Sequence, residues 1–147
     1  MNAPWTPRPR WVFLDSSGFL ALVNPHDAYH QQARAAWTRL TDEQWHTFST
    51  NFVVAETHAL FLTRLSHQRA ESFLRQILRS STTIVRVSQR DEQQAQAIIF
   101  RYGDKSFSYT DASSFAVMER LRIGPAFTFD RNFAQYGLQV MGPNEGT

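Results

Sequence analysis

The chain has 147 residues, 42% of them hydrophobic, which favours one globular domain with a substantial core and argues against disorder. The formal net charge of +2 is too mild an excess to assign a nucleic-acid partner by itself. No apolar run approaches the roughly 20 residues that cross a bilayer, and cysteine is absent, which excludes disulfides and thiolate metal sites.

Short apolar segments alternate with helical patterns from residue 11 onward. We expect strands at residues 11–15, 46–49, 83–87, 126–129 and 138–141. We expect helices at residues 16–23, 27–40, 50–65, 66–79, 88–102 and 110–122, with caps at Asp27, Thr50 and Thr110. This alternation predicts a single α/β domain whose central, mostly parallel sheet has about four or five short strands and is flanked by helices.

Both ends of the chain differ in composition from the segment between them. Pro4, Pro7 and Pro9 predict a flexible N-terminal tail over residues 1–10. Residues 142–147 are expected to form a C-terminal tail, which leaves residues 11–141 as the domain. The first residues lack the apolar core of an export signal, so we expect a cytoplasmic protein with no membrane partner.

Four acidic residues lie beside apolar sequence. Asp15 and Asp130 each end an apolar run that is expected to be a strand. Glu56 shares its helix face with apolar residues, and Asp111 lies in the first turn of an apolar helix. A carboxylate beside buried surface is costly unless something positive meets it, so these acids need an explanation.

The predicted fold brings these acids together. The carboxyl ends of parallel strands share one sheet edge, where Asp15 and Asp130 should emerge. The first turn that carries Asp111 faces the same edge, and Glu56 is expected to point inward. Converging carboxylates repel each other unless a cation lies among them. The pattern therefore predicts a site for Mg²⁺ or Mn²⁺, hard cations that prefer oxygen ligands.

Each acid also has an ordinary structural explanation. Asp15 and Asp130 can cap the helices that follow them, and Asp111 can be a first-turn acid. Glu56 can pair with Arg64. Other acids lie in loops or beside polar neighbours and are expected to be solvated: Asp42, Glu43, Asp91, Glu92 and Glu119.

Four segments carry the acids in a recognisable order: Val12–Ala21, Val54–Glu56, Ser108–Ser113 and Phe127–Phe133. Together they resemble the PIN domain, and more closely the toxin ribonucleases of the VapC type. The resemblance covers residues 11–141 and rests on the ordered set Asp, Glu, Asp, Asp, because a strand that ends in Asp is common by itself. It implies a PIN-like domain with the activity of a metal-dependent endoribonuclease.

The resemblance also implies roles for individual residues. The acidic quartet, which would be catalytic and would bind Mg²⁺ or Mn²⁺, is Asp15, Glu56, Asp111 and Asp130. Asp104 matches a further position that is often acidic in the family. Ser17 and Thr128 match small polar positions that would orient carboxylates or waters. In this scheme a metal-activated water attacks the RNA phosphodiester, and no side chain acts as the nucleophile.

Possible partners follow from the same resemblance and from the charges. Lys105 and Arg131 lie close in sequence to the quartet and are the first candidates for RNA contacts, ahead of Arg75 and Arg79. The resemblance implies the toxin of a type II toxin–antitoxin system, with an antitoxin as partner. Apolar residues on two adjacent helices suggest core packing first and a homodimer or antitoxin surface second: Phe61, Leu62, Leu65, Phe73, Ile77 and Leu78.

Other functions stay open at this point. The N-terminal tail is longer than the usual start of such a toxin, which leaves a PIN-type nuclease of RNA processing as an alternative. A catalytically inactive RNA-binding PIN module is a further one, against which the complete quartet argues. His26 and His30 have the spacing of a helical zinc pair, but two imidazoles without a third ligand are weak support for zinc.

Overall fold

A computed structural model describes residues 9–141 and shows a four-stranded sheet. The strands are β1 (Trp11–Leu14), β2 (His46–Thr50), β3 (Thr83–Val85) and β4 (Ala126–Phe127). Their spatial order is β3-β2-β1-β4, and every pair is parallel. The predicted α/β fold with a parallel sheet and short strands is confirmed.

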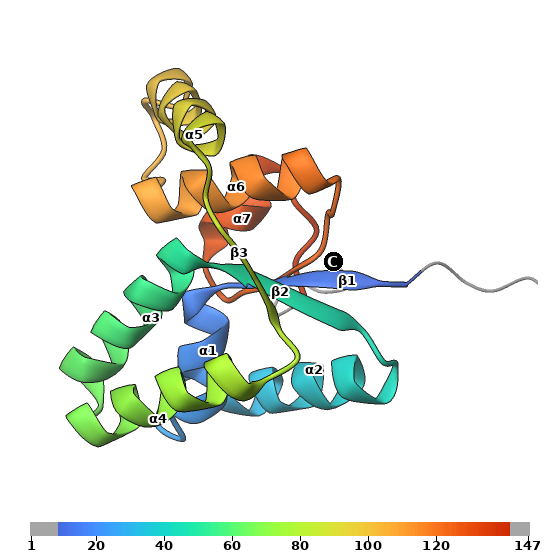
Figure 1. The fold of residues 1–147 in the computed structure, drawn as a ribbon, viewed down its shortest axis with the longest axis vertical. Coiled ribbons are helices and arrows are strands. Elements are labelled where there is room, and N and C mark those ends of the chain that lie inside the picture. The colour runs from blue at the N-terminus through green and yellow to red at the C-terminus, as the bar shows by residue number, and fades with distance from the viewer. Residues whose placement is uncertain (1–8, 142–147) are drawn as a thin grey trace, which may run out of the picture.

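Seven helices within the described residues cover the sheet on both faces. They are α1 (Ser16–Val23), α2 (His30–Asp42), α3 (Asn51–Arg64), α4 (His67–Arg79), α5 (Gln89–Arg101), α6 (Tyr109–Leu121) and α7 (Arg131–Tyr136). Figure 1 shows α1 to α4 on one side of the sheet and α5 to α7 on the other. None of the helices described is long and apolar enough to cross a membrane.

The central strand β1 explains why the sheet forms the core. Its residues Val12, Phe13 and Leu14 are fully buried, because helices cover both faces. A strand buried on both sides has a continuous apolar sequence, which is the pattern that predicted it. On one face Phe13 packs against Phe48 of β2 and Phe133 of α7.

Two predicted helix caps are wrong. The helix expected from Asp27 begins at His30, and Asp27 instead accepts a hydrogen bond from the backbone N–H of Tyr29 at 2.8 Å. The helix expected to be capped by Thr110 is capped by Ser108, in a capping box whose acid is Asp111. At both positions the sequence offers more than one side chain that could cap the helix. The geometry of the turn before the helix decides which residue is the N-cap.

Three further expectations are corrected by the packing. Residues 138–141 contribute only an isolated bridge between Val140 and Ala126 in place of a fifth strand. Asp91, expected to be solvated, is 3% exposed and forms a bidentate ion pair with Arg120. Leu78, which the helical pattern placed inward, is 77% exposed.

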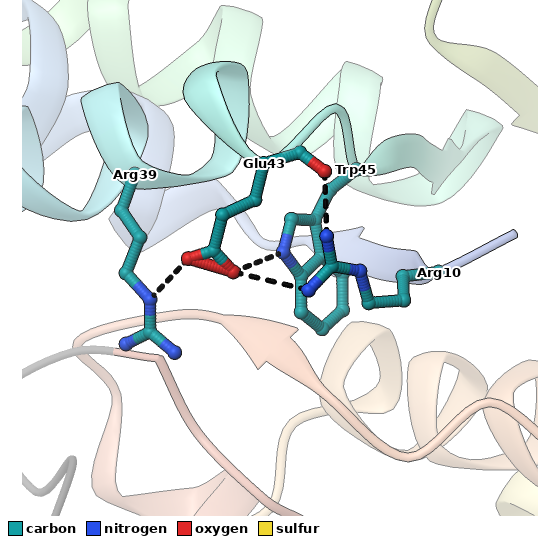
Figure 2. Close-up of polar contacts among 4 residues, drawn as sticks. All are labelled: Arg10, Arg39, Glu43 and Trp45. Carbon is teal, nitrogen blue, oxygen red and sulfur yellow. Dashed lines mark hydrogen bonds and ion pairs between the residues drawn. The ribbon is translucent and has the colours of Figure 1, made fainter. Parts of the chain in front are cut away.

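Glu43, which was also expected to be solvated, has several partners. Figure 2 shows its carboxylate between Arg39, Arg10 and the indole N–H of Trp45, at 2.9, 3.2 and 3.2 Å. The hydrogen bond from Trp45, followed by that from Arg39, lowers the pKa of Glu43. Arg10, at the end of the expected tail, is therefore held against the domain, whereas residues 1–8 and 142–147 lie outside the described residues.

Candidate active site

The acids of the expected quartet extend from four different elements. Asp15 directly follows β1 and is the N-cap of α1. Asp130 lies shortly after β4 and is the N-cap of α7. Asp111 is in the first turn of α6, and Glu56 is in α3, the helix that follows β2. The parallel sheet directs all four elements to its carboxyl edge, so residues far apart in sequence meet there.

Asp15 lies at the centre of this arrangement, 1% exposed. Its Oδ2 atom accepts hydrogen bonds from the hydroxyls of Ser17 and Thr128, at 2.8 and 2.9 Å. It also receives a longer contact from the backbone N–H of Ser17, at 3.4 Å. The other oxygen, Oδ1, is buried and has no hydrogen-bond partner. One oxygen thus caps α1, as the ordinary explanation proposed, and the other is left unsatisfied.

A glycine allows this cap to form. A Cβ atom on Gly18 would lie 2.5 Å from Cδ1 of Phe127 and 2.7 Å from its carbonyl oxygen. Only a residue without a side chain therefore lets the first turn of α1 approach β4 so closely. That approach brings Ser17 and Thr128 within 3.1 Å of each other, on the same carboxylate oxygen.

Asp111 is buried and held from two sides. Its Oδ2 atom accepts a hydrogen bond from the Ser108 backbone N–H at 3.2 Å, which completes the capping box of α6. The same oxygen accepts a hydrogen bond from the side-chain amide of Asn132 at 2.9 Å. Asn132 also donates to the Ser106 carbonyl at 3.1 Å, so α7 and the loop before α6 are tied at this carboxylate.

Glu56 and Asp130 are less buried than the other two acids. Glu56 accepts a short hydrogen bond from the hydroxyl of Ser16, which holds it beside the start of α1. Asp130 accepts from the Asn132 backbone N–H at 2.9 Å and so caps α7, as the ordinary explanation proposed. Its own N–H donates to the Thr128 hydroxyl at 3.1 Å.

The electrostatics show that these carboxylates affect each other. Burial raises the pKa of Asp15 to about 7, the charges of Asp111 and Asp130 add to this rise, and the bonds from Ser17 and Thr128 oppose it. Burial also raises the pKa of Asp111, helped by the charges of Asp130 and Glu56 and opposed by Asn132. No arginine or lysine contributes to either pKa among the principal causes. The cluster is therefore an uncompensated concentration of negative charge.

The donor set fits a hard divalent cation. It offers carboxylate oxygens only, and the buried Oδ1 of Asp15 lacks any partner. Among residues 9–141, no three Asp, Glu or His side chains lie close enough together to hold a metal ion without bridging waters or rearrangement. Mutual repulsion keeps carboxylates apart, and Mg²⁺ keeps several waters and takes only one or two carboxylates directly, so an open arrangement suits a hydrated ion.

The remaining predicted site residues lie beside the acids. Lys105, Arg131 and Asp104 line a pocket of about 270 Å³ that Asp130 also borders. Asp104 is highly exposed and lies 3.5 Å from the Lys105 ammonium, so it is separate from the buried acids. The histidine pair is not supported as a zinc site, since the helix begins at His30 and the His30 ring bonds the Ala21 carbonyl.

Sequence reasoning missed two residues that hold the acids. Asn132 was not singled out, although it lies two positions after Asp130 in a short polar stretch. Ser16 was not singled out because its neighbour Ser17 already matched the small polar position expected beside Asp15. The signal available for both was a small polar residue adjacent to a proposed ligand, in the turn that begins a helix.

Comparisons with known proteins agree with this geometry. The PIN domain model matches residues 12–138. The 23S rRNA-specific endonuclease VapC20 of Mycobacterium tuberculosis is 30% identical over 132 residues, which cover 90% of this chain and 98% of that protein. Its crystal structure, described as a Sarcin-Ricin loop cleaving toxin, superposes with a TM-score of 0.80 over 86% of this chain and 95% of that one.

More distant structures share the fold. VapBC2 from Rickettsia felis, bound to a promoter DNA fragment, has 13% identity and a TM-score of 0.66, covering 88% of this chain and 96% of that one. A toxin–antitoxin complex from Klebsiella pneumoniae has 16% identity and a TM-score of 0.61, covering 88% and 94%. At this identity the likeness concerns the fold alone. The family model and the VapC20 match together show that this chain belongs to the PIN domain family.

Proposed function

We propose that this protein is a Mg²⁺- or Mn²⁺-dependent endoribonuclease and the toxin of a type II toxin–antitoxin system. The observation that carries the metal dependence is the buried Asp15 carboxylate, whose Oδ1 has no partner and whose charged neighbours are other acids. A buried carboxylate without a cation is costly, and a divalent ion removes that cost. The VapC20 relative, an endonuclease by name, supports the activity.

The residues of the chain would divide the work of holding the ion. Asp15, Glu56, Asp111 and Asp130 would be its ligands, directly or through water. When bound, such an ion supplies an activated water and stabilises charge on the phosphodiester. Ser17 and Thr128 fix Oδ2 of Asp15 and leave Oδ1 for the ion.

The supporting residues would keep the other ligands in place. Asn132 holds Asp111, and Ser16 holds Glu56. In this proposal the attacking group is water. Lys105 and Arg131 border the pocket next to Asp130 and are the first candidates to contact an RNA phosphate there. Asp104 would at most bind an outer water, because it is exposed and paired with Lys105.

The first test is cleavage of total bacterial RNA by the purified protein. We expect cleavage with Mg²⁺ or Mn²⁺ and none with EDTA. Asp15→Asn should remove cleavage while leaving the circular dichroism spectrum unchanged. Asp42→Asn is a matched control, since Asp42 is an exposed acid at the end of α2 and should not affect activity. Cleavage that persists in EDTA would contradict the metal dependence, and full activity of Asp15→Asn would remove that residue from the mechanism.

The substrate proposal follows the VapC20 relative. We take 23S rRNA as the first candidate, because VapC20 is named for specificity toward it. Primer extension across 23S rRNA from treated ribosomes should show one dominant cut. Cuts scattered over many RNAs, or confined to a precursor RNA, would instead favour the role in RNA processing.

The toxin proposal requires an inhibitor. We propose a cytoplasmic protein held inactive by an antitoxin, as the toxin–antitoxin complexes among similar structures suggest. Inducing the chain alone should arrest growth, and co-expression of a small neighbouring gene should restore it. Arrest that Asp15→Asn also causes would be toxicity unrelated to cleavage.

The homodimer also stays a proposal. Exposed apolar side chains on the adjacent helices α3 and α4 support a protein contact surface: Leu62 at 45% and Leu78 at 77% exposure. Light scattering of the purified chain should give twice its mass of 17.0 kDa. A monomer mass at micromolar concentration would contradict it.

A further inference from the structure

A second pocket borders the acids on the side away from Lys105. Its volume is about 400 Å³, and it lies between α1, α3, the loop that joins α1 to α2, and the segment after β4. On α3 it is lined by Glu56, Leu60 and Arg64, which follow each other at four-residue spacing and so share one helix face. Asp130 borders this pocket and the Lys105 pocket, so the two meet at the acidic cluster.

An aromatic ring is presented at the wall of this pocket. Tyr29 stacks on Phe129 with ring centroids 5.1 Å apart and planes inclined by 17°, and Tyr29 remains 40% exposed. The loop that carries Tyr29 is held by Asp27, whose carboxylate accepts the Tyr29 N–H at 2.8 Å. One ring face is therefore supported from behind, by packing and by a fixed backbone, while part of the side chain remains open to a ligand.

The same pocket contains a cation without a partner. The guanidinium of Arg64 makes no hydrogen bond, ion pair or ring contact with any other residue in the described part of the chain. Glu56, which was considered as its partner, bonds Ser16 instead. Arg64 lies two helical turns from Glu56, roughly 12 Å along the axis of α3. It is thus separated from Glu56 along the helix and is available to an anion.

We propose that this pocket binds a single-stranded RNA segment next to the scissile phosphate. An unpaired base stacks on Tyr29, and Arg64 binds a neighbouring phosphate of the same strand. Stacking on an aromatic ring tolerates every base, whereas the forked guanidinium suits phosphate oxygens. The inference rests on the proposed function in taking RNA as the ligand, and it makes Tyr29 and Arg64 positioning residues on one side of the acids.

Charge favours RNA over a basic protein side chain at the Arg64 end of the pocket. A lysine or arginine from a partner would meet the unpaired Arg64 and be repelled, whereas a phosphate would be attracted. At the other end, the negative charges of Glu56 and Asp130 are those that the proposed cation would offset. The pocket therefore provides a cation for phosphate and a ring for a base.

The test measures binding, which does not depend on cleavage. The full chain carries Asp15→Asn so that it does not cleave its ligand. In the presence of Mg²⁺ it is titrated against two fluorescent ligands of equal length, an oligouridylate and an abasic oligoribonucleotide. Adding Tyr29→Ala should weaken oligouridylate binding by about 5- to 150-fold and leave abasic binding within about twofold, because only the stacking is lost. Tyr29→Phe should restore the preference. Phe100→Ala, which removes an exposed ring from α5, should have no effect.

The phosphate contact has its own readout. Arg64→Ala should reduce the slope of log affinity against log salt by about 0.7, the value for one phosphate of a single strand. Arg79→Ala is the matched control, because Arg79 ends α4 next to the start of β3, at the opposite sheet edge. The melting temperature of each variant shows whether it is folded. Tyr29→Leu and Arg64→Gln, which also remove the ring and the charge, replace any variant that unfolds.

The outcomes separate this inference from the proposed function. Loss of the base preference in Tyr29→Ala supports the inference, even if the wild-type chain cleaves no RNA. Cleavage by the wild-type chain together with unchanged base preference and salt slope overturns the inference and leaves the proposed function standing. The inference is also overturned if the chain binds no single-stranded RNA. The same holds if the Tyr29 and Arg64 variants weaken binding of a partner protein but not of RNA.

Discussion

Two buried aspartates occupy equivalent positions in neighbouring helices and have opposite electrostatic states. Asp91 in α5 and Asp111 in α6 each complete a capping box, with Ser88 and Ser108 respectively. They are 3% and 5% exposed. For Asp91, burial is outweighed by hydrogen bonds from Arg120 and Ser88, so its pKa is lowered. For Asp111, burial and neighbouring acids prevail, and its pKa is raised.

The two aspartates share the capping motif and the degree of burial. What distinguishes the structural acid from the candidate ligand is the group that its carboxylate contacts. Asp91 receives a bidentate guanidinium at 2.8 and 2.9 Å and is fully compensated. Asp111 receives one neutral amide, from Asn132, and faces other carboxylates. An acid that remains uncompensated in a well-packed interior is therefore a candidate ligand for a cation.

The largest expected effect tests this distinction through activity. Asp111→Asn should reduce RNA cleavage by at least about 100-fold, because it removes a charged ligand of the proposed ion. Asp91→Asn should leave the cleavage rate per folded molecule unchanged, although it shares the motif and the burial. Both variants are assayed on total RNA with Mg²⁺, and the folded fraction is taken from circular dichroism. Equal losses in the two variants would erase the distinction.

The sequence could predict the position of Asp111 but not its difference from Asp91. The strand before Asp15 was predictable because three consecutive apolar residues indicate burial on both sides. The ordered acids and the parallel sheet then predicted a common edge. Asp91 was misread as solvated because Arg120 is 29 positions away, and a contact across two helices leaves no local signal. The strand expected at residues 138–141 is only a single bridge, from Val140 to Ala126. How many residues pair there depends on a tertiary contact, which the local sequence does not specify.

The second prediction concerns pH and the metal-free protein. Asp15 has a folded pKa of about 7, above its ordinary value of 3.8. The native state therefore binds more protons than the unfolded state between these values, so the free energy of unfolding should fall as pH rises from about 4 to about 7. Above pH 7 both states are ionised and this contribution levels off. The total loss should be on the order of a few kcal/mol.

Urea unfolding in EDTA at several pH values measures this fall. Asp15→Asn should flatten the curve, and saturating Mg²⁺ should restore stability to the wild type at pH 7.5 but not to the variant. A wild-type curve that rises steadily from pH 4 to pH 7 would show that Asp15 is compensated, as Asp91 is.

The third prediction removes the compensation from Asp91. Arg120→Met keeps the side-chain stem but leaves the buried carboxylate without its guanidinium, and should cost about 1–3 kcal/mol of unfolding free energy. Because Arg120 is 44% exposed, water can replace part of the interaction, which favours the lower half of that range. Arg75→Met is the control: its pair with Glu71 is exposed on α4, so its loss should leave the free energy of unfolding almost unchanged. Cleavage should be unchanged in both variants.

The smallest expected effect comes from Asn132, whose side-chain amide donates a hydrogen bond to Asp111. Asn132→Ala removes the hydrogen bond that orients this carboxylate, so Mg²⁺ affinity should fall by about tenfold while the fold is retained. The activity should recover at high Mg²⁺, because the ligand itself remains. Asn132→Asp is the informative comparison, since it places a further negative charge against Asp111 and should raise the pKa of Asp111 further. If Asn132→Ala cannot be rescued by Mg²⁺, Asn132 acts on the substrate and not on the orientation of Asp111.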